Sequence, residues 1–378
     1  MRRCAFCLIA LYLCAIFAGC DAKDPENLFE TTATQETATQ DAVTVPPATE
    51  PIVSIYETYY QYGNMQKNFP SGNYILKDNK VMFTWVSSRS MMLYEYDVQT
   101  GEISFLCKDA TCTHNPQDAS AKDCPSNKVW GNLEQYHGKL YAKDQDWQIA
   151  ELKDGQFRKL FDGAVSCFWH ADGNLYVETQ DNSLLVYENG SNTPRVLLDE
   201  YAERWNTVFG QYLYSGAGQG ICRVDLLAEN PQIEVLKKDC SGITDGQYIY
   251  YLDPTESDHL YRCDMDGGNA QLLVDQPVFL GSINFDEEYL YFRMYDLDNM
   301  FGEGSCDLYR MRKTGPAQIE KIAEFPESIQ SVYTVPGYNL LFVETVVLGE
   351  EESDNGVSYL YVTSTDGKNI VPLEIPGA

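Results

Sequence analysis

The sequence predicts an all-β fold built from a repeated unit, and three features of the chain carry this prediction. A short apolar strand that ends in an aromatic residue recurs seven times. A further strand and a glycine-containing turn follow most copies, as in residues 260–264 and the turn 266–268. No long segment shows the 3.6-residue period of an amphipathic helix. Short strands at regular spacing are typical of repeat architectures made of β-sheets.

The copies define the size of the unit. The final aromatic residues of the recurring strand are Phe83, Tyr141, Tyr176, Tyr214, Tyr250, Tyr291 and Phe342. With the strand before this one and two strands after it, each unit has four strands. Residues 73–378, divided by seven, give about 44 residues per unit, the length of a propeller blade. We therefore expect a β-propeller of seven four-stranded blades, with six and eight blades as the alternatives.

The N-terminus has the pattern of an export signal. Two arginines follow Met1, residues 4–18 form an apolar run, and Ala18 and Gly19 precede Cys20. The run is shorter than the roughly 20 residues that a spanning helix needs. Small residues directly before a cysteine resemble the bacterial lipobox, which implies that residues 1–19 are a lipoprotein signal peptide and that Cys20 carries the lipid. Cleavage by the ordinary signal peptidase and a retained short anchor are the alternatives.

Residues 20–50 are rich in Thr, Ala and Pro and lack apolar periodicity, so we expect a solvated tether. Residues 51–378 are then one propeller domain with a cysteine-rich insert at 107–128. This organisation predicts a protein anchored by its lipid to the bacterial cell membrane, on the extracytoplasmic face. Whether residues 52–62 add a strand that closes the ring stays open.

The formal net charge is -29. Such an acidic chain repels phosphate backbones, so we expect no nucleic-acid partner. Its basic residues are scattered, which also disfavours docking on anionic lipid through a basic patch.

Eight of the 12 cysteines lie in the folded part, and in an exported domain this favours disulfides. Cys112 and Cys124 form the expected local bridge, with Cys107 pairing elsewhere. The alternative is a zinc site made of Cys107, Cys112, His114 and Cys124. The metal status is therefore unknown from sequence. The remaining cysteines lie in or beside repeat strands, where buried free thiols are the alternative.

Long acidic loops join second to third strands, on the face where the blade-to-blade connections also open. These loops contain the candidate ligand residues Asp296, Asp298, Glu303, Glu350, Glu351 and Asp354. Such a face suits a calcium ion or a basic partner. The alternative is an acidic rim that only keeps the protein soluble. We expect no other cofactor.

Catalytic motifs are missing from the sequence. The four histidines show no metal-binding spacing, and there is no Gly-x-Ser-x-Gly elbow. The glycine-rich run 216–220 lies between two strands and lacks the dinucleotide fingerprint. We therefore expect that the protein is not an enzyme.

Residues 249–253, with the sequence Ile-Tyr-Tyr-Leu-Asp, are followed by Leu-Tyr-Arg-Cys-Asp-Met-Asp-Gly-Gly-Asn at 260–269. This pair resembles the YWTD-type repeat of low-density-lipoprotein-receptor-like propellers. The segment 106–114, with Asp123, Cys124 and Pro125, is similar to one in bacterial surface lipoproteins of unknown function that carry a related propeller. The resemblance implies a fold and a family and brings no activity.

Three functions remain, in this order. The first is a non-catalytic module that binds a protein or peptide through its acidic loop face. The second is a glycan-binding module, motivated by Trp130, Trp147, Trp169 and Trp205, which an exposed tryptophan would favour. The third is a hydrolase with paired carboxylates at the central channel.

Overall fold

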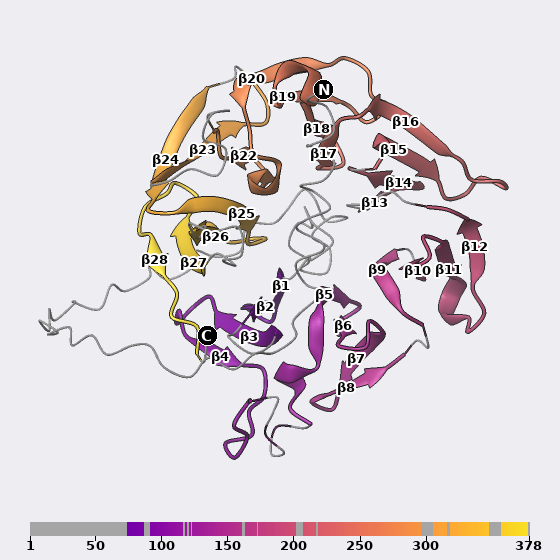
Figure 1. The fold of residues 1–378 in the computed structure, drawn as a ribbon, viewed down its shortest axis with the longest axis vertical. Coiled ribbons are helices and arrows are strands. Elements are labelled where there is room, and N and C mark those ends of the chain that lie inside the picture. The colour runs from indigo at the N-terminus through magenta and orange to yellow at the C-terminus, as the bar shows by residue number, and fades with distance from the viewer. Residues whose placement is uncertain are drawn as a thin grey trace, which may run out of the picture. The chain divides into compact units, whose positions relative to one another are not determined.

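The computed structural model shows seven four-stranded antiparallel sheets arranged as a β-propeller, as the repeats predicted (Figure 1). It describes residues 74–86, 91–115, 118, 121, 123–160, 163–171, 173–201, 207–216, 218–295, 305–315, 318–347 and 357–376. All of these belong to one compact unit, Thr44–Ala378. Cys20, the tether and residues 52–62 lie outside the described residues. No helix among the described residues is long and apolar enough to cross a bilayer.

Each blade takes four consecutive strands in sequence order. Blade 1 has β1 (Tyr74–Lys77), β2 (Lys80–Val86), β3 (Met91–Asp97) and β4 (Ile103–Phe105). Blade 2 has β5 (Val129–Tyr136), β6 (Lys139–Asp144), β7 (Ile149–Lys153) and β8 (Gln156–Lys159). Blade 3 has β9 (Val165–Ala171), β10 (Asn174–Thr179), β11 (Leu184–Tyr187) and β12 (Arg195–Leu198). Blade 4 has β13 (Thr207–Phe209), β14 (Tyr212–Ser215), β15 (Gly220–Asp225) and β16 (Ile233–Lys238).

The same order continues to the C-terminus. Blade 5 has β17 (Ser241–Thr244), β18 (Tyr248–Asp253), β19 (His259–Asp264) and β20 (Gln271–Pro277). Blade 6 has β21 (Asn284–Phe285), β22 (Tyr289–Phe292), β23 (Cys306–Arg312) and β24 (Ile319–Phe325). Blade 7 has β25 (Ser328–Thr334), β26 (Leu340–Val347), β27 (Val357–Ser364) and β28 (Val371–Pro372). Short 3-10 turns are η2 (Pro125–Asn127), η3 (Glu188–Gly190), η4 (Pro254–Glu256) and η5 (Leu280–Ser282).

The core lies between blades, and alternation along the second strand creates it. In β2, Val81 and Phe83 pack towards blade 7, whereas Met82 packs towards blade 2. Successive strand residues point to opposite faces of a sheet, so one apolar strand serves two interfaces. The described residues form an apolar cluster at each of the seven junctions between neighbouring blades. An open ring would expose two of these faces, which explains why the ring closes.

Aspartates fix the turn that leads into the aromatic strand. Asp245 Oδ1 accepts hydrogen bonds from the backbone N–H of Gln247 and Tyr248, and its Oδ2 accepts one from the Tyr250 hydroxyl. Asp286 repeats this arrangement one blade later. A side chain that bonds its own backbone two residues on stabilises a tight turn. The recurring sequence thus encodes both the turn and the orientation of the tyrosine.

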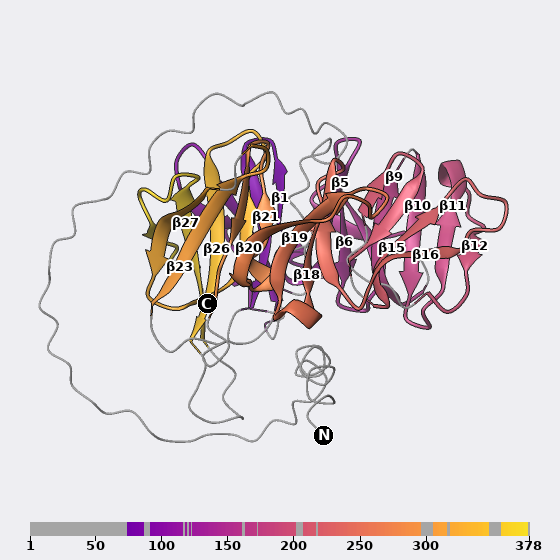
Figure 2. The ribbon, with the colours of Figure 1, turned by 90° about the horizontal axis from the view of Figure 1, so that it is seen from above.

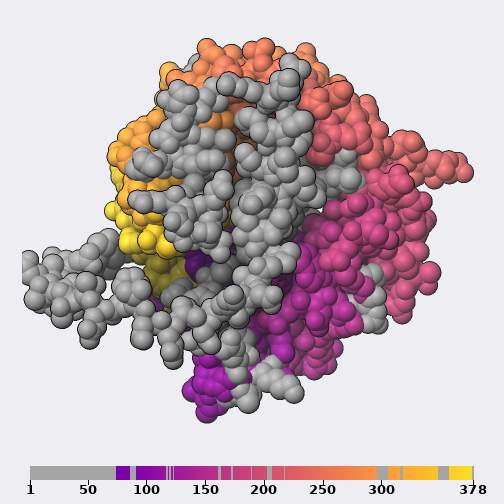
Figure 3. All heavy atoms as spheres, viewed as in Figure 1, coloured from indigo at the N-terminus to yellow at the C-terminus, as the bar shows by residue number. Residues whose placement is uncertain are grey.

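The ring closes where the first and last blades meet. In Figure 3 the indigo atoms of blade 1 lie beside the yellow atoms of blade 7. Tyr74 of β1 stacks on Tyr333 of β25 with ring centroids 4.0 Å apart, and the Tyr94 hydroxyl donates to the carbonyl of Pro376. Blades 1 and 7 share no strand among the described residues, so side-chain packing holds this junction together.

Candidate functional site

One end of the blades collects the long connections. Because the four strands of each blade alternate in direction, the connection from the second to the third strand opens at the same end as the connection to the next blade. We call this end the loop face. In blades 1 and 2 it includes residues 106–128, between β4 and β5, and residues 145–148, between β6 and β7. Figure 2 shows the blades from the side.

Four potential metal ligands converge in the first of these connections. Cys107 follows β4, Cys112 and His114 lie in the next turn, and Cys124 precedes η2. One ligand atom from each residue lies within 4.8 Å of all the others. His114 Nδ1 is 3.5 Å from Cys124 Sγ. The Cys124 side chain is buried, and the other three are partly exposed. The four residues of the Cys3His site, which the sequence allowed as an alternative to a disulfide, therefore lie together in the structure.

Backbone N–H groups point at two of the sulfurs. The N–H of His114 donates to Cys112 Sγ over 3.4 Å, and the N–H of Ser126 donates to the Cys124 thiol. Both bonds span two residues, and such bonds stabilise negative charge on sulfur. The N–H of Cys107 donates to Ser126 Oγ over 3.0 Å, which ties the start of the insert to its end.

Burial sets the proton affinities in the cluster. It raises the pKa of the Cys124 thiol to about 12, and contacts with Cys112 and Cys107 act in the same direction. Burial lowers the pKa of His114, although Asp109 opposes this effect. His114 is therefore neutral at pH 7 and carries a free lone pair on one ring nitrogen. The His114 ring stacks on Phe105 with centroids 4.1 Å apart, which fixes its plane.

The expected disulfide between Cys112 and Cys124 is absent from the structure. All eight cysteines of the described residues are free thiols. Two sulfurs in a disulfide lie about 2.05 Å apart. The Cys112 and Cys124 sulfurs instead share their surroundings with Cys107 and His114. Cys222, Cys240 and Cys263 are buried in or beside blade strands, as the free-thiol alternative proposed.

The tryptophans divide into exposed and buried positions. Trp147 lies on the loop face with 40% of its surface exposed, beside the partly buried Trp130 at a centroid distance of 6.3 Å. Trp169 is buried and stacks on Tyr176. Trp205 lies outside the described residues. Trp85, the fifth tryptophan of the chain, is also buried. Among the tryptophans that the structure describes, Trp147 and Trp130 are therefore the two placed to contact a ligand.

The backbone of Trp147 adopts an unusual conformation. Its φ is +61°, a left-handed value that bulky residues rarely adopt. Asp144 Oδ1 accepts hydrogen bonds from the N–H of Asp146 and Gln148, and the Trp147 N–H donates to the Asp144 carbonyl. The Lys143 ammonium lies 4.5 Å from the centre of the Trp147 ring. Such strain persists only where the surroundings impose it, and it often marks a functional position. No local sequence pattern marks this conformation of Trp147.

The turn of Trp147 is coupled to the insert. Gln145 Nε2 donates a hydrogen bond to the carbonyl of Asn127, in the turn that follows Cys124. The Cys3His cluster and the Trp147 turn are thus neighbouring parts of one surface.

The predicted acidic ligand residues lie outside the described residues, as does the lipid attachment residue. These are Asp296, Asp298, Glu303, Glu350, Glu351, Asp354 and Cys20. The calcium and lipid predictions therefore stay predictions.

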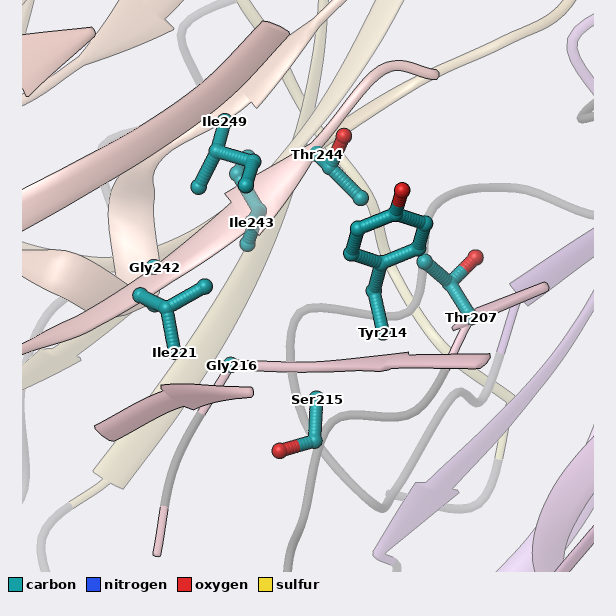
Figure 4. A pocket seen from close by; sticks show the side chains of 9 residues that line it. All are labelled: Thr207, Tyr214, Ser215, Gly216, Ile221, Gly242, Ile243, Thr244 and Ile249. Carbon is teal, nitrogen blue, oxygen red and sulfur yellow. The ribbon is translucent and has the colours of Figure 1, made fainter. Parts of the chain in front are cut away.

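Two other features could resemble an active site: a buried Glu–His pair and a small pocket. Glu134 Oε2 lies 2.7 Å from His170 Nδ1, but both side chains are almost buried between blades 2 and 3, with Tyr136 stacked on the imidazole. The pocket in Figure 4, between blades 4 and 5, has a volume of about 20 Å³, enough for about one water. Its lining has no carboxylate, imidazole or thiol. Its residues are Thr207, Tyr214, Ser215, Gly216, Ile221, Gly242, Ile243, Thr244 and Ile249.

Comparisons with known proteins add little beyond this geometry. No family model and no curated protein matches the chain. Among solved structures, it resembles a GH74 enzyme of Niastella koreensis at 13% identity, over 64% of this chain and 44% of that one, with a TM-score of 0.42. It also resembles the computationally designed Ika8 protein at 13% identity, over 78% and 80% of the two chains, with a TM-score of 0.42.

A third similar structure is the tricorn protease, at 12% identity over 80% of this chain and 40% of that one, with a TM-score of 0.35. The chain spans less than half the length of this protease and of the GH74 enzyme. At such TM-scores, none of these structures assigns an activity to the chain.

Proposed function

We propose that the protein is a lipid-anchored, extracytoplasmic binding module that uses the loop face of its propeller and catalyses no reaction. The single observation that carries this proposal is Trp147, which is exposed on the loop face and held at positive φ. An exposed, rigid aromatic ring is a common anchor for a ligand. The lipid anchor at Cys20 and the acidic loops rest on the sequence alone.

The first ligand class is a protein or peptide with basic character, because the chain carries a net charge of -29. A glycan is the second class. The Trp147–Trp130 pair supports it, because sugar rings stack on exposed aromatic faces.

Binding experiments with one variant and a matched control test the proposed surface. The probes are solubilised peptidoglycan fragments, mucin glycans and a basic peptide library, measured by thermal shift and calorimetry with the purified protein. Trp147→Ala should weaken binding of any active probe at least tenfold. Leu227→Ala removes an exposed apolar side chain from the turn between β15 and β16, at the opposite end of the blades, and should leave binding unchanged.

The outcome also separates the ligand classes. Binding of glycans alone would favour the second class, and binding of peptides alone would favour the first. Equal affinity in Trp147→Ala and the unchanged protein would place the binding surface elsewhere. Release of shortened products from a probe would overturn the non-catalytic assignment.

The anchor has a separate test. Mass spectrometry of the mature N-terminus should find a lipid on Cys20, and Cys20→Ala should move the protein from the membrane fraction to the soluble fraction. A mature N-terminus at any other residue would contradict the lipid anchor.

A further inference from the structure

The insert between blades 1 and 2 contains the one group of three or more Cys, His, Asp or Glu ligand atoms that come together among the described residues. We propose that Cys107, Cys112, His114 and Cys124 bind one Zn²⁺ through three thiolates and His114 Nδ1. This inference does not depend on the proposed binding function, because it concerns how the insert is held.

The distances fit one tetrahedral ion. Zinc–sulfur bonds of about 2.3 Å and zinc–nitrogen bonds of about 2.0 Å, at tetrahedral angles, separate sulfur from nitrogen by about 3.5 Å. His114 Nδ1 and Cys124 Sγ are 3.5 Å apart. The same geometry separates two sulfurs by about 3.8 Å. All ligand atoms of the cluster lie within 4.8 Å of one another. The separations between ligand atoms therefore need to shorten by no more than about 1 Å for one ion to bind all four.

The donor set favours zinc over the ions that bind oxygen ligands. Three soft thiolates with one imidazole suit Zn²⁺ and exclude the oxygen-seeking ions Ca²⁺ and Mg²⁺. The calcium expected from the acidic loops would therefore bind elsewhere. Four protein ligands also fill the coordination sphere, which is typical of structural rather than catalytic zinc.

The surroundings of the ligands support a preformed site. Hydrogen bonds from the N–H of His114 and of Ser126 orient two of the sulfurs. Phe105 holds the plane of the imidazole, and Ser126 Oγ accepts the N–H of Cys107. Partners of this kind orient ligands in known metal sites. Residues 107–115, which carry three of the four ligands, are all exposed or partly exposed, so apolar burial does little to hold this part of the insert.

A structural ion here would also organise the loop face. It joins the end of β4 to the start of η2, and the carbonyl of Asn127 in η2 accepts the hydrogen bond of Gln145 in the Trp147 turn. Metal binding at the cluster should therefore stabilise both the insert and the turn that presents Trp147.

Metal stoichiometry tests the proposal directly. The protein, purified without a polyhistidine tag in the presence of a thiol reductant, should contain one equivalent of zinc by inductively coupled plasma mass spectrometry. Cys112→Ser and His114→Ala should lower zinc affinity by roughly 100-fold or more, since even removal of an outer partner costs about 10- to 100-fold. Cys306→Ser, a partly exposed thiol outside the cluster, should keep one equivalent.

Two further measurements distinguish loss of the site from misfolding. Co²⁺ added to the metal-free protein should give the intense visible bands of a tetrahedral thiolate site, and Cys112→Ser should change them even if it folds. Zinc removal should speed hydrogen exchange in residues 107–128 and 145–148, whereas the turn 226–232 should not respond. Less than about 0.1 equivalent of zinc with unchanged exchange, or a Cys112–Cys124 disulfide in the exported protein, would overturn the proposal.

Discussion

The Tyr74 hydroxyl donates a 2.7 Å hydrogen bond to Oε1 of Glu344, across the junction between the first and last blades. Glu344 lies on β26, and burial raises the pKa of its carboxyl group. Hydrogen bonds from Tyr74, Tyr333 and Ser331 lower this pKa and offset part of the effect. One partly buried acid therefore sits at the site where the ring closes.

This acid predicts a pH dependence of stability. A carboxyl group whose pKa is higher in the folded than in the unfolded state stabilises the fold most below its unfolded pKa of about 4.3. That contribution is lost as the pH rises through the folded pKa. Relative to Glu344→Gln, the unchanged protein should thus lose free energy of unfolding as the pH rises above about 4.3. Urea unfolding between pH 4.5 and pH 8 measures the difference, and parallel curves for the two proteins would contradict the prediction.

A buried ion pair joins blades 5 and 6. Lys313 Nζ lies 3.2 Å from Asp245 Oδ2, and both side chains are almost fully buried. Asp245→Ala should lower the free energy of unfolding by about 3–5 kcal/mol, because it leaves a buried ammonium without its carboxylate. Asp245→Asn with Lys313→Met removes both charges and should recover part of the loss in chemical denaturation. A double variant as unstable as Asp245→Ala would refute the pairing as the cause.

Two turn glycines with the same conformation should respond differently to alanine. Gly138 and Gly367 have φ near +75°, but only at Gly367 would a Cβ atom meet backbone atoms, those of Ile322 in blade 6. The positive φ alone costs alanine about 1–2 kcal/mol. Gly138→Ala should show this cost, and Gly367→Ala should lose about 1–3 kcal/mol more through overpacking. Equal melting temperatures of the two variants would show that the blade 6 contact adapts.

Two tryptophans, one buried and one exposed, should separate effects on stability from effects on binding. Trp169 is buried between blades 3 and 4, so Trp169→Ala should lower the free energy of unfolding by about 3–5 kcal/mol. Trp147→Ala removes an exposed ring and should change stability by less than about 1 kcal/mol. Thermal and urea unfolding of both variants measure this contrast. A large loss in Trp147→Ala would mean that the ring supports the fold.

Local sequence patterns were enough to predict the blades. The alternation in Val81, Met82 and Phe83 predicts a strand with two buried faces, and the structure divides these residues between two junctions. The turn aspartates and glycines lie a few residues from their partners, so their role is readable from the chain. Blade number followed from the spacing of the copies, and seven blades are confirmed.

Local sequence patterns did not predict the contacts between blades. Glu134 and His170 meet across 36 residues, and nothing in either local sequence marks them as partners. The exposure and strained backbone of Trp147 also depend on packing around it. For the insert, spacing allowed either a disulfide or a metal site, because both use close cysteines. Only the positions of the His114 nitrogen and the three sulfurs separate the two.

We propose that a Cys3His zinc centre holds the insert on the loop face. The deciding measurement is X-ray absorption at the zinc edge of the purified protein. The spectrum should show three sulfur neighbours at about 2.3 Å and one nitrogen neighbour at about 2.0 Å. A shell of nitrogen and oxygen neighbours alone, or no bound zinc, would contradict it.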